Sequence, residues 1–411
     1  MKITHIHIER FRGFQNEDFE VGSQLTAIAG QNGTQKSTLL GIVTQTFTLK
    51  PEDPMRAEKP LCGGSYISAF KDKFRLSPIF DRPKGHEWTI SFDIGVDDFT
   101  VESIKRTGDP NVRFWKKGAR QEGDGYISFP TIFLSLKRLV PMAEEAKIIT
   151  DDTLLTPEEL SEFKQLHNKI LIVQTPISSA TTITSKNKQS IGVSTELYDW
   201  NQNSMGQDNL GKIILALFSF KRLHDKYPQQ YKGGILAIDE MDATMYPASQ
   251  VELLKILRKY ASKLNLQILF TTHSMSLLKV MDDLVQEVSK QEETAKQVKI
   301  LYLKKVDDKI TIKQNVDFKG IKLDLNVVAE GKKRKKNKIT VYTEDNENIL
   351  FVKAILKTKA SILDFVDVTL PCSTLTELVN KNIPAFKHPY SIIGKSSVSC
   401  PLKPSDSAPL K

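Results

Sequence analysis

The fold of this chain is decided by a nine-residue stretch, Gly30-Gln31-Asn32-Gly33-Thr34-Gln35-Lys36-Ser37-Thr38. It follows the apolar run Leu-Thr-Ala-Ile-Ala at 25–29 and precedes the run Leu-Leu-Gly-Ile-Val at 39–43. This order predicts a strand, a glycine-rich loop and a helix. In such a loop the backbone N–H groups turn inward to hold phosphates, the lysine reaches the outer phosphates and the hydroxyl holds Mg²⁺.

The stretch departs from the strict phosphate-loop pattern at one position. Gln35 stands directly before the lysine, where that pattern has glycine, and its β-carbon is expected to crowd the loop. An alternative interpretation is a strand-turn-helix corner whose glycines serve only the turn. We predict nucleotide binding. The residues predicted to contact the nucleotide here are Gly30, Asn32, Gly33, Thr34, Lys36, Ser37 and Thr38.

An apolar run that ends in two acids lies far downstream. It reads Gly-Ile-Leu-Ala-Ile at 234–238 and is followed by Asp239 and Glu240. A buried parallel strand presents its last residues at the carboxyl edge of the sheet, where ligands bind. We therefore expect Asp239 to bind Mg²⁺ and Glu240 to activate the attacking water as a general base. The alternative is a strand followed by an acidic turn.

Two further segments complete the expected site. The apolar run 266–270 leads into Thr271-Thr272-His273, and a neutral imidazole there can sense a γ-phosphate and orient water. A lone histidine at a strand end is, alternatively, an ordinary surface or core group. The segment Asn-Ser-Met-Gly-Gln at 203–207 opens a predicted helix, so its backbone N–H groups can face an anion.

Together these segments resemble the ABC-type ATPase head of the SMC, RecF and OLD families. The resemblance assigns Walker A to 30–38, the signature to 204–207, Walker B to 235–240, the D-loop to Asp242 and the switch histidine to His273. It implies that two heads enclose two ATP molecules. The residues implied to act in trans, on the partner's nucleotide, are Ser204, Gly206 and Gln207.

Two other segments support the same resemblance. Residues 6–14, Ile-His-Ile-Glu-Arg-Phe-Arg-Gly-Phe, resemble the opening strand and turn of these heads, which implies that Arg12 lies near the nucleotide. Residues 240–247, with Gln250 downstream, are most similar to the AAA domain of the OLD family. The glutamine that commonly follows the strand corresponding to 131–140 has no clear counterpart here.

The middle of the head is predicted from its periodicity. Residues 88–94 and 99–104 alternate with period two, which indicates an antiparallel β-layer. Thr156 begins a predicted helix that runs to about residue 173. Residues 175–195 are rich in Ser, Thr and Lys, so we expect a mobile loop there.

The C-terminal part begins with a block of six positive charges at 332–338, read as a linker or as a phosphate-contacting arm. Residues 339–356 then resemble the start of a Toprim domain, which implies Glu344 as a possible metal ligand. A plain βα unit with a surface acid is the alternative. The Asp-x-Asp pair expected after residue 393 is missing, so nuclease activity is expected to be lost.

Composition sets the remaining limits. The 411 residues suggest two domains or one with insertions, and 40% apolar with 26% charged residues is ordinary for a soluble protein. No apolar run approaches 18 residues, and the three cysteines are widely spaced, so we expect a cytoplasmic protein without a membrane span, disulfide framework or zinc site. A net charge of +9 suits a polyanion such as DNA.

We therefore predict an α/β protein in two parts. Residues 1–330 form an ABC-type P-loop ATPase head, whose mixed sheet carries an antiparallel β-layer and a helical and loop insertion at about 142–200. Residues 331–338 form a basic linker, 339–393 a partial Toprim-like unit and 394–411 a disordered tail.

The resemblance also implies a function. It implies an ATPase that uses ATP and Mg²⁺, forms a homodimer through ATP-sandwiched heads, and acts on or is regulated by DNA, in DNA repair or phage defence. A nuclease or effector protein is a further possible partner. The alternatives are an ATP-regulated OLD-type endonuclease, whose metal site a partner completes, and a nucleotide-binding scaffold without turnover.

Overall fold

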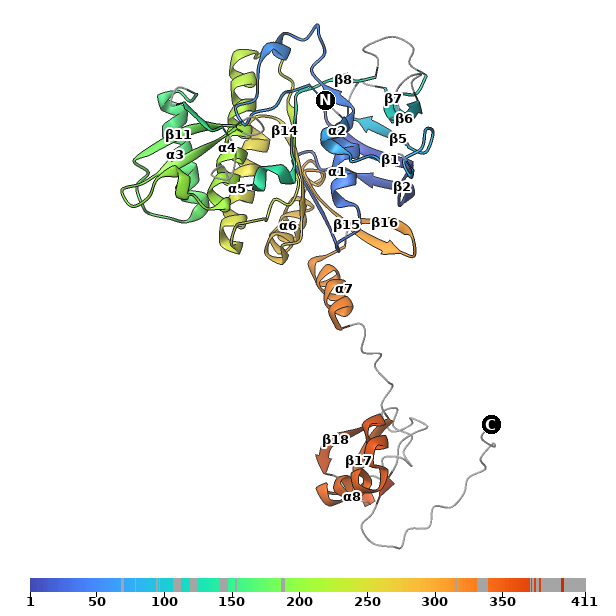
Figure 1. Cartoon of the computed structure of the whole chain (residues 1–411). Coiled ribbons are helices and arrows are strands. Elements are labelled where there is room, and N and C mark those ends of the chain that lie inside the picture. Colours follow the sequence, from blue (N-terminus) through green and yellow to red (C-terminus); the bar gives the residue numbers. More distant parts are fainter. Residues whose placement is uncertain are drawn as a thin grey trace. The chain divides into compact units, whose positions relative to one another are not determined.

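The computed structural model of the chain divides into two compact units, residues 1–325 and 326–411 (Figure 1). It describes residues 1–330 and 339–369, together with 371, 373, 374, 377, 393 and 394. Within the first range it leaves out 68–69, 78, 94, 96, 106–111, 119–124, 141–146, 152–153, 186–188 and 315. The predicted linker 331–338 and almost all of the predicted tail therefore lie outside the described residues.

A mixed six-stranded sheet forms the centre of the first unit. Its order is β16 (Lys309–Gln314), β15 (Val298–Val306), β3 (Leu25–Gly30), β14 (Leu266–Thr272), β13 (Gly234–Ile238) and β9 (Thr131–Leu134). All neighbours are parallel except β16, which pairs antiparallel with β15. The predicted α/β fold with a mixed sheet is confirmed, and β3, β13 and β14 end at the same edge.

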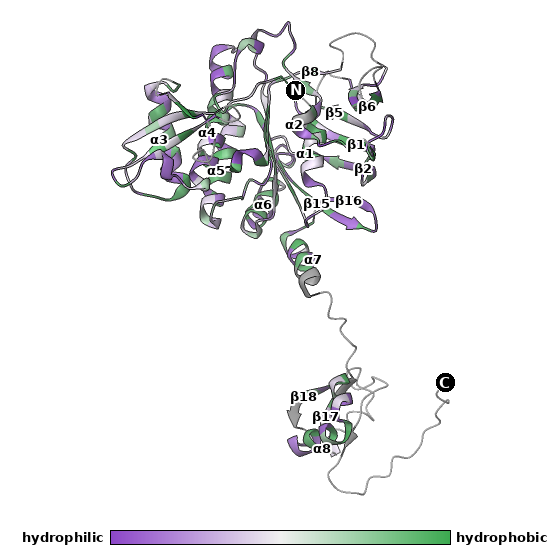
Figure 2. Ribbon diagram, in the orientation of Figure 1, coloured by the Kyte–Doolittle hydropathy of each residue, from purple (hydrophilic) through white to green (hydrophobic). Residues whose placement is uncertain are grey.

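The central strands are buried on both faces. On β13, Leu236 and Ile238 point into a core shared with helices, while Ile235 and Ala237 point into a second core. The first core is covered by α3 (Pro157–Leu171), α4 (Met205–Lys226), α5 (Pro247–Lys263) and α6 (Met275–Val288). Figure 2 shows the hydrophobic colouring along these central strands. Continuous apolar runs are typical of such doubly covered strands.

The second core lies between the central sheet and an antiparallel sheet. That sheet has the order β2 (Phe14–Glu20), β1 (Ile3–Phe11), β5 (Glu87–Phe92), β6 (Phe99–Lys105) and β7 (Val112–Lys116). Helix α1 (Lys36–Gln45) and the short α2 (Phe70–Lys73) also contribute to this core. Strands β4 (Phe47–Thr48) and β8 (Ile127–Ser128) pair separately. The predicted antiparallel β-layer is thus confirmed.

A buried glutamine fastens the antiparallel sheet to the central one. Gln267 on β14 is 1% exposed, and its side-chain Oε1 accepts a hydrogen bond from Ile3 N at 2.7 Å. Its Nε2 donates to Ile3 O at 2.9 Å and to Gly22 O at 3.0 Å. Buried backbone groups need such partners, so one side chain satisfies three of them and fixes the start of β1.

The insertion differs from its prediction in one respect. Helix α3 begins at a capping box of Thr156 and Glu159, in agreement with the prediction. The mobile loop predicted at 175–195 is wrong, because β11 (Ser179–Thr184) and β12 (Gln189–Ser194) form a hairpin that pairs with β10 (Ile149–Asp151). Its β-branched Ile183, Ile191 and Val193 are buried, and such residues favour strands despite the polar composition around them.

The remaining elements are short or belong to the second unit. In the part of the chain that the structure describes, 3₁₀ turns span Pro54–Ala57, Leu136–Leu139, Trp200–Gln202 and Lys357–Ile362. Helix α7 (Phe318–Glu330) contains the boundary between the units. The second unit has β17 (Ile339–Thr343), α8 (Asn346–Leu356), β18 (Leu363–Thr369) and β19 (Ile393–Gly394), with β17 in the middle of a parallel sheet. No helix in the described part of the chain is long and apolar enough to cross a membrane.

We predict that Gln267→Leu lowers the free energy of unfolding by at least about 3 kcal/mol, because it leaves three buried backbone groups without partners. Guanidinium unfolding monitored by circular dichroism measures this. Gln286→Leu, at an exposed position on α6, is the matched control and should shift the value by no more than about 0.5 kcal/mol. Equal effects of the two substitutions would contradict the role assigned to Gln267.

Candidate active site

The loop between β3 and α1 folds around the side chain of Lys36. Its ammonium donates to Gly30 O at 3.1 Å and to Gln31 O at 3.0 Å, and Thr34 Oγ1 donates to Gln31 O at 2.8 Å. Burial lowers the pKa of Lys36, and the carboxylates of Glu240, Asp239 and Asp242 offset part of that fall. Gly33 has a φ of +81° and open space where a side chain would stand, so the loop can accept phosphates there.

Gln35 has the left-handed backbone that explains why glycine is usual at this position. Its φ is 61° and its ψ is 33° at the N-cap of α1. That conformation costs a residue with a β-carbon about 1–2 kcal/mol. The side chain turns toward the β1–β2 turn, where Gly13 N donates to its Oε1 at 3.4 Å. The departure from the pattern thus appears as backbone strain at Gln35.

The carboxylate of Asp239 joins the three central segments of the site. It is 4% exposed, and its Oδ1 accepts from Ser37 Oγ at 2.8 Å and from Thr271 Oγ1 at 2.7 Å. Thr271 Oγ1 also accepts from Glu240 N at 2.6 Å. The parallel register that pairs Ile238 with Phe270 places these groups side by side.

The oxygens of Ser37 and Asp239 fit Mg²⁺, which prefers hard oxygen ligands. Mg²⁺ bound with a nucleotide takes only one or two protein groups, and phosphates and water supply the rest. Among the described residues no group of three or more His, Cys, Asp or Glu side chains is arranged to hold a metal on its own. Ser37 Oγ and Asp239 Oδ1, which lie 2.8 Å apart, could therefore hold a Mg²⁺ ion that is bound together with a nucleotide.

His273, the predicted switch histidine, lies beside Asp242, the predicted D-loop residue. His273 N donates to the Asp242 carboxylate at 3.3 and 3.4 Å. Partial burial lowers the pKa of His273 and the Lys36 ammonium lowers it further, while the carboxylates of Asp242, Glu240 and Asp239 offset part of the fall. The imidazole is therefore mainly neutral at pH 7, the state in which it can accept a proton.

The signature segment caps helix α4. Ser204 Oγ accepts from Gln207 N at 3.3 Å, Ser204 N donates to Gln207 Oε1 at 2.8 Å, and Ser204 itself is exposed. A β-carbon on Gly206 would lie 2.6 Å from Thr244 O, so only glycine lets the helix approach the D-loop this closely. The signature therefore has one exposed polar residue and one glycine packed on its own D-loop.

Arg12 lies near the loop, but its guanidinium is engaged with Asp81. Its Nε and Nη2 each donate to that carboxylate at 2.9 Å, and Nη1 donates to Thr38 Oγ1 at 3.3 Å. Burial alone would raise the pKa of Asp81, but hydrogen bonds from Arg12, Ser77 N and His86 lower it to about 2. Asn32 is exposed on the loop, and in the second unit Glu344 follows β17 and is half-buried.

Sequence reasoning missed a buried arginine next to Walker B. Arg138 follows β9 and is 1% exposed; its Nη2 donates to Glu240 O at 2.8 Å and its Nε to Asn209 Oδ1 at 2.7 Å. Asn209, on α4, donates in turn to Ala243 O at 3.1 Å. Burial lowers the pKa of Arg138 to about 10, so it stays charged at pH 7. The available signals were the basic pair Lys137-Arg138, which begins three residues after the end of β9, and an asparagine in an apolar helix.

Gln250, which the sequence offered only as part of the resemblance, holds the other side of the same loop. Gln250 on α5 donates to Asp242 O at 3.1 Å and to Met245 O at 2.8 Å, and its Oε1 accepts from Ser274 Oγ at 2.5 Å. Within the loop, Glu240 and Thr244 have left-handed backbones, with φ of 48° and 69°. Side chains from three separate elements thus fix a strained loop that carries the acids.

We predict that Arg138→Met lowers kcat for ATP at least about tenfold, while ATP affinity changes less than about threefold. Arg138 holds the backbone of Glu240, and it donates no hydrogen bond to the described residues 30–38 of the phosphate loop. Arg138→Lys should not restore kcat, since one ammonium cannot reach both Glu240 O and Asn209 Oδ1. Steady-state ATPase assays and equilibrium binding measure the two effects. A normal kcat in Arg138→Met would contradict this role.

We also predict that the pKa of His273 in the nucleotide-free protein lies below 6.5 and rises when MgATP binds, because the γ-phosphate stabilises the imidazolium. The titration of its ring C–H resonance by NMR, assigned with His273→Gln, measures both values. ADP lacks the γ-phosphate and is the control; it should raise the pKa less. Equal pKa values with ATP and without nucleotide would show that His273 does not face the γ-phosphate.

Comparison with known proteins adds a family match over part of the chain. Residues 137–278 match the model of an AAA ATPase domain. That segment contains Arg138, the signature, Walker B and His273, and the phosphate loop lies outside it. The curated proteins gave no significant match.

Several solved structures are similar at low identity. The SMC head domain from Thermotoga maritima has a TM-score of 0.43 and 13% identity, covering 77% of this chain and all of the other. The Smc head domain of Pyrococcus furiosus, bound to the C-terminal domain of ScpA, has a TM-score of 0.42 and 13% identity, covering 81% and 100%. The ATP-bound recombination mediator RecF has a TM-score of 0.39 and 12% identity, covering 77% and 98%. The AAA match covers the part of the candidate site that contains Asp239, Glu240 and His273.

Proposed function

We propose that this chain binds ATP with Mg²⁺ at the loop 30–38 and hydrolyses it, as an ATPase similar to the SMC and RecF heads. One observation carries the proposal. The hydroxyl of Ser37 in the phosphate loop lies 2.8 Å from the buried carboxylate of Asp239. Glu240 follows Asp239 in the chain, and His273 follows the neighbouring strand β14. A strand-turn-helix corner that served only the fold would not need the pair of Ser37 and Asp239.

Each residue of the site has a role in the reaction. The Lys36 ammonium now bonds the carbonyls of Gly30 and Gln31, and it can exchange them for the β- and γ-phosphate oxygens. Ser37 and Asp239 would hold Mg²⁺, which when bound neutralises charge on the phosphates.

Glu240 and His273, which follow Asp239 in the chain, would act on the attacking water and its proton. The Glu240 carboxylate stands one residue further along the sheet edge and accepts the proton of the attacking water. The neutral imidazole of His273 orients the γ-phosphate or the water from the neighbouring strand. The carbonyl of Glu240 is fixed by Arg138, so the position of the general base depends on that bond.

The finer predictions belong to the same proposal. Ser204 is exposed at the start of α4, which supports its action in trans, with Gly206 and Gln207 beside it, in a homodimer of ATP-sandwiched heads. The net charge of +9 supports DNA as a partner, in an OLD-like protein of DNA repair or phage defence in the cytoplasm. Glu344, at the end of β17, remains a candidate metal ligand of a Toprim-like unit.

We predict that Lys36→Ala weakens ATP binding at least about tenfold, the equivalent of one charge-assisted hydrogen bond. Glu240→Gln should retain ATP and lose about 10²–10⁴-fold in kcat, because only the general base is removed. Steady-state hydrolysis and equilibrium binding, with and without duplex DNA, measure both, and Glu293→Gln is the matched surface control.

Two outcomes would overturn parts of this function. Normal turnover by Glu240→Gln would remove Glu240 from the mechanism. ATP binding by the wild-type protein without any turnover would replace the ATPase with a nucleotide-binding scaffold.

A further inference from the structure

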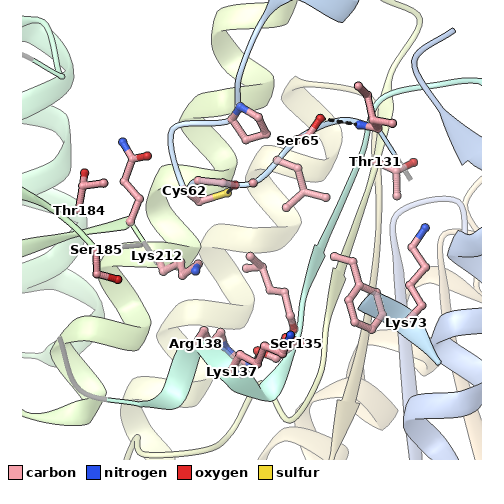
Figure 3. Close-up of a pocket in the computed structure, with 18 of the residues that line it drawn as sticks. Cys62, Ser65, Lys73, Thr131, Ser135, Lys137, Arg138, Thr184, Ser185 and Lys212 are labelled. Carbon is pink, nitrogen blue, oxygen red and sulfur yellow. Dashed lines mark hydrogen bonds between the residues drawn. The ribbon is translucent and has the colours of Figure 1, made fainter. Parts of the chain in front are cut away.

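A cavity of about 410 Å³ lies at the outer edge of the central sheet, and none of the phosphate-loop residues 30–38 lines it (Figure 3). One wall is the edge strand β9, which pairs with β13 on its other side. The other walls come from the loop 60–67, from α4 and from the β11–β12 hairpin. The cavity is therefore separate from the nucleotide site and has a size typical of small-molecule sites.

The charged groups that line this cavity are all positive among the residues that the structure describes. They are Lys73, Lys137, Arg138 and Lys212, and none of the described lining residues is Asp or Glu. These cations come from α2, from the turn after β9 and from α4, so three separate elements bring them to one place. The carboxylates of Asp239, Glu240 and Asp242 offset part of the charge of Arg138 from the other side. The lysines still repel one another where solvent is partly excluded, and a bound anion relieves that repulsion.

The rest of the lining also suits an oxyanion. Hydroxyl and amide groups of Ser65, Thr131, Ser135, Thr184, Ser185 and Gln189 supply hydrogen-bond donors. Burial raises the pKa of the Cys62 thiol to about 11, so this sulfur stays neutral and adds no negative charge at pH 7. Gly63 and Gly64, with φ of +78° and +83°, form the turn that closes this wall.

We propose that this cavity binds a phosphomonoester, carried either by a free nucleotide or by the 5′ end of a nucleic acid strand. A phosphate dianion accepts from several cations and hydroxyls at once, which is the set of groups assembled here. The volume accommodates a single nucleotide and excludes a duplex, so only the end of a nucleic acid can enter. The proposal does not depend on ATP hydrolysis.

The cavity is linked to the active site through one side chain. Arg138 lines the cavity, and its Nη2 also holds Glu240 O at 2.8 Å. A phosphate bound in the cavity would therefore attract the same guanidinium that holds the Walker B loop. Lys73 has a structural bond as well, because its ammonium donates to Thr44 O at 2.6 Å. Lys137 and Lys212 are the residues to change, because both line the cavity and neither lies in the phosphate loop or the Walker B segment.

The test uses the full chain with Lys36→Ala, which weakens the ATP loop without touching the cavity. Calorimetry should show binding of thymidine 5′-monophosphate or of a 5′-phosphorylated single-stranded oligonucleotide, and at least tenfold weaker binding of the same molecules without the phosphate. Adding Lys137→Ala with Lys212→Met should weaken phosphate binding at least tenfold. Lys259→Ala, an exposed lysine on α5, is the control and should change nothing.

The outcomes of these binding measurements either support the phosphate site or overturn it. Binding of the mononucleotide alone assigns a small-molecule site, and binding of the oligonucleotide alone assigns a strand terminus. Failure of both to bind, or equal affinity in the Lys137 and Lys212 variant, overturns the proposal. Circular dichroism checks the fold, and if Lys212→Met unfolds the chain, Lys137→Ala alone carries the test, since Lys137 is exposed. Failure of ATP turnover would leave these binding results unaffected.

Discussion

The hydrogen bonds to one buried carboxylate organise the candidate active site of this structure. Asp239 Oδ1 accepts from Ser37 Oγ of the phosphate loop and from Thr271 Oγ1 of the neighbouring strand. Ser37 is 202 residues from Asp239 in the chain and Thr271 is 32 residues from it, yet both hydroxyls donate to the same oxygen atom. A buried carboxylate without such partners would be costly, so the register of β13 against β14 and the position of α1 depend on one another.

The loop that follows Asp239 is the strained part of the site. Its left-handed residues Glu240 and Thr244 are kept in place because side chains of Arg138, Asn209 and Gln250 hold its carbonyls. Strain of this kind persists only where the surroundings determine the backbone fully. The same contacts connect helix α4, the cationic cavity and the loop of Asp239 and Glu240, so a change at any of them reaches the proposed general base.

Those parts of the site that depend on short stretches of sequence could be predicted. One such stretch is the glycine-rich loop before Lys36, and another is the apolar run that ends in Asp239 and Glu240. Each stretch predicts a strand and the residues at its carboxyl end, whatever the rest of the chain contains. Arg138 could not be assigned, because its partners Asn209 and Glu240 are 71 and 102 residues away and only the folded chain brings them together. The hairpin of β11 and β12 was missed because the Ser, Thr and Lys content of 175–195 indicated a loop, and only a few apolar residues of these strands are buried in the core.

The central claim is that Ser37 and Asp239 form the metal end of an ATP site. Electron paramagnetic resonance of Mn²⁺, a substitute for Mg²⁺, measures this directly in the wild type and in Asp239→Asn. Our account predicts ATP-dependent Mn²⁺ binding by the wild type and at least tenfold weaker binding by the variant, because the anionic oxygen ligand is lost. Equal Mn²⁺ affinity in the two proteins, with ATP bound to both, would contradict it.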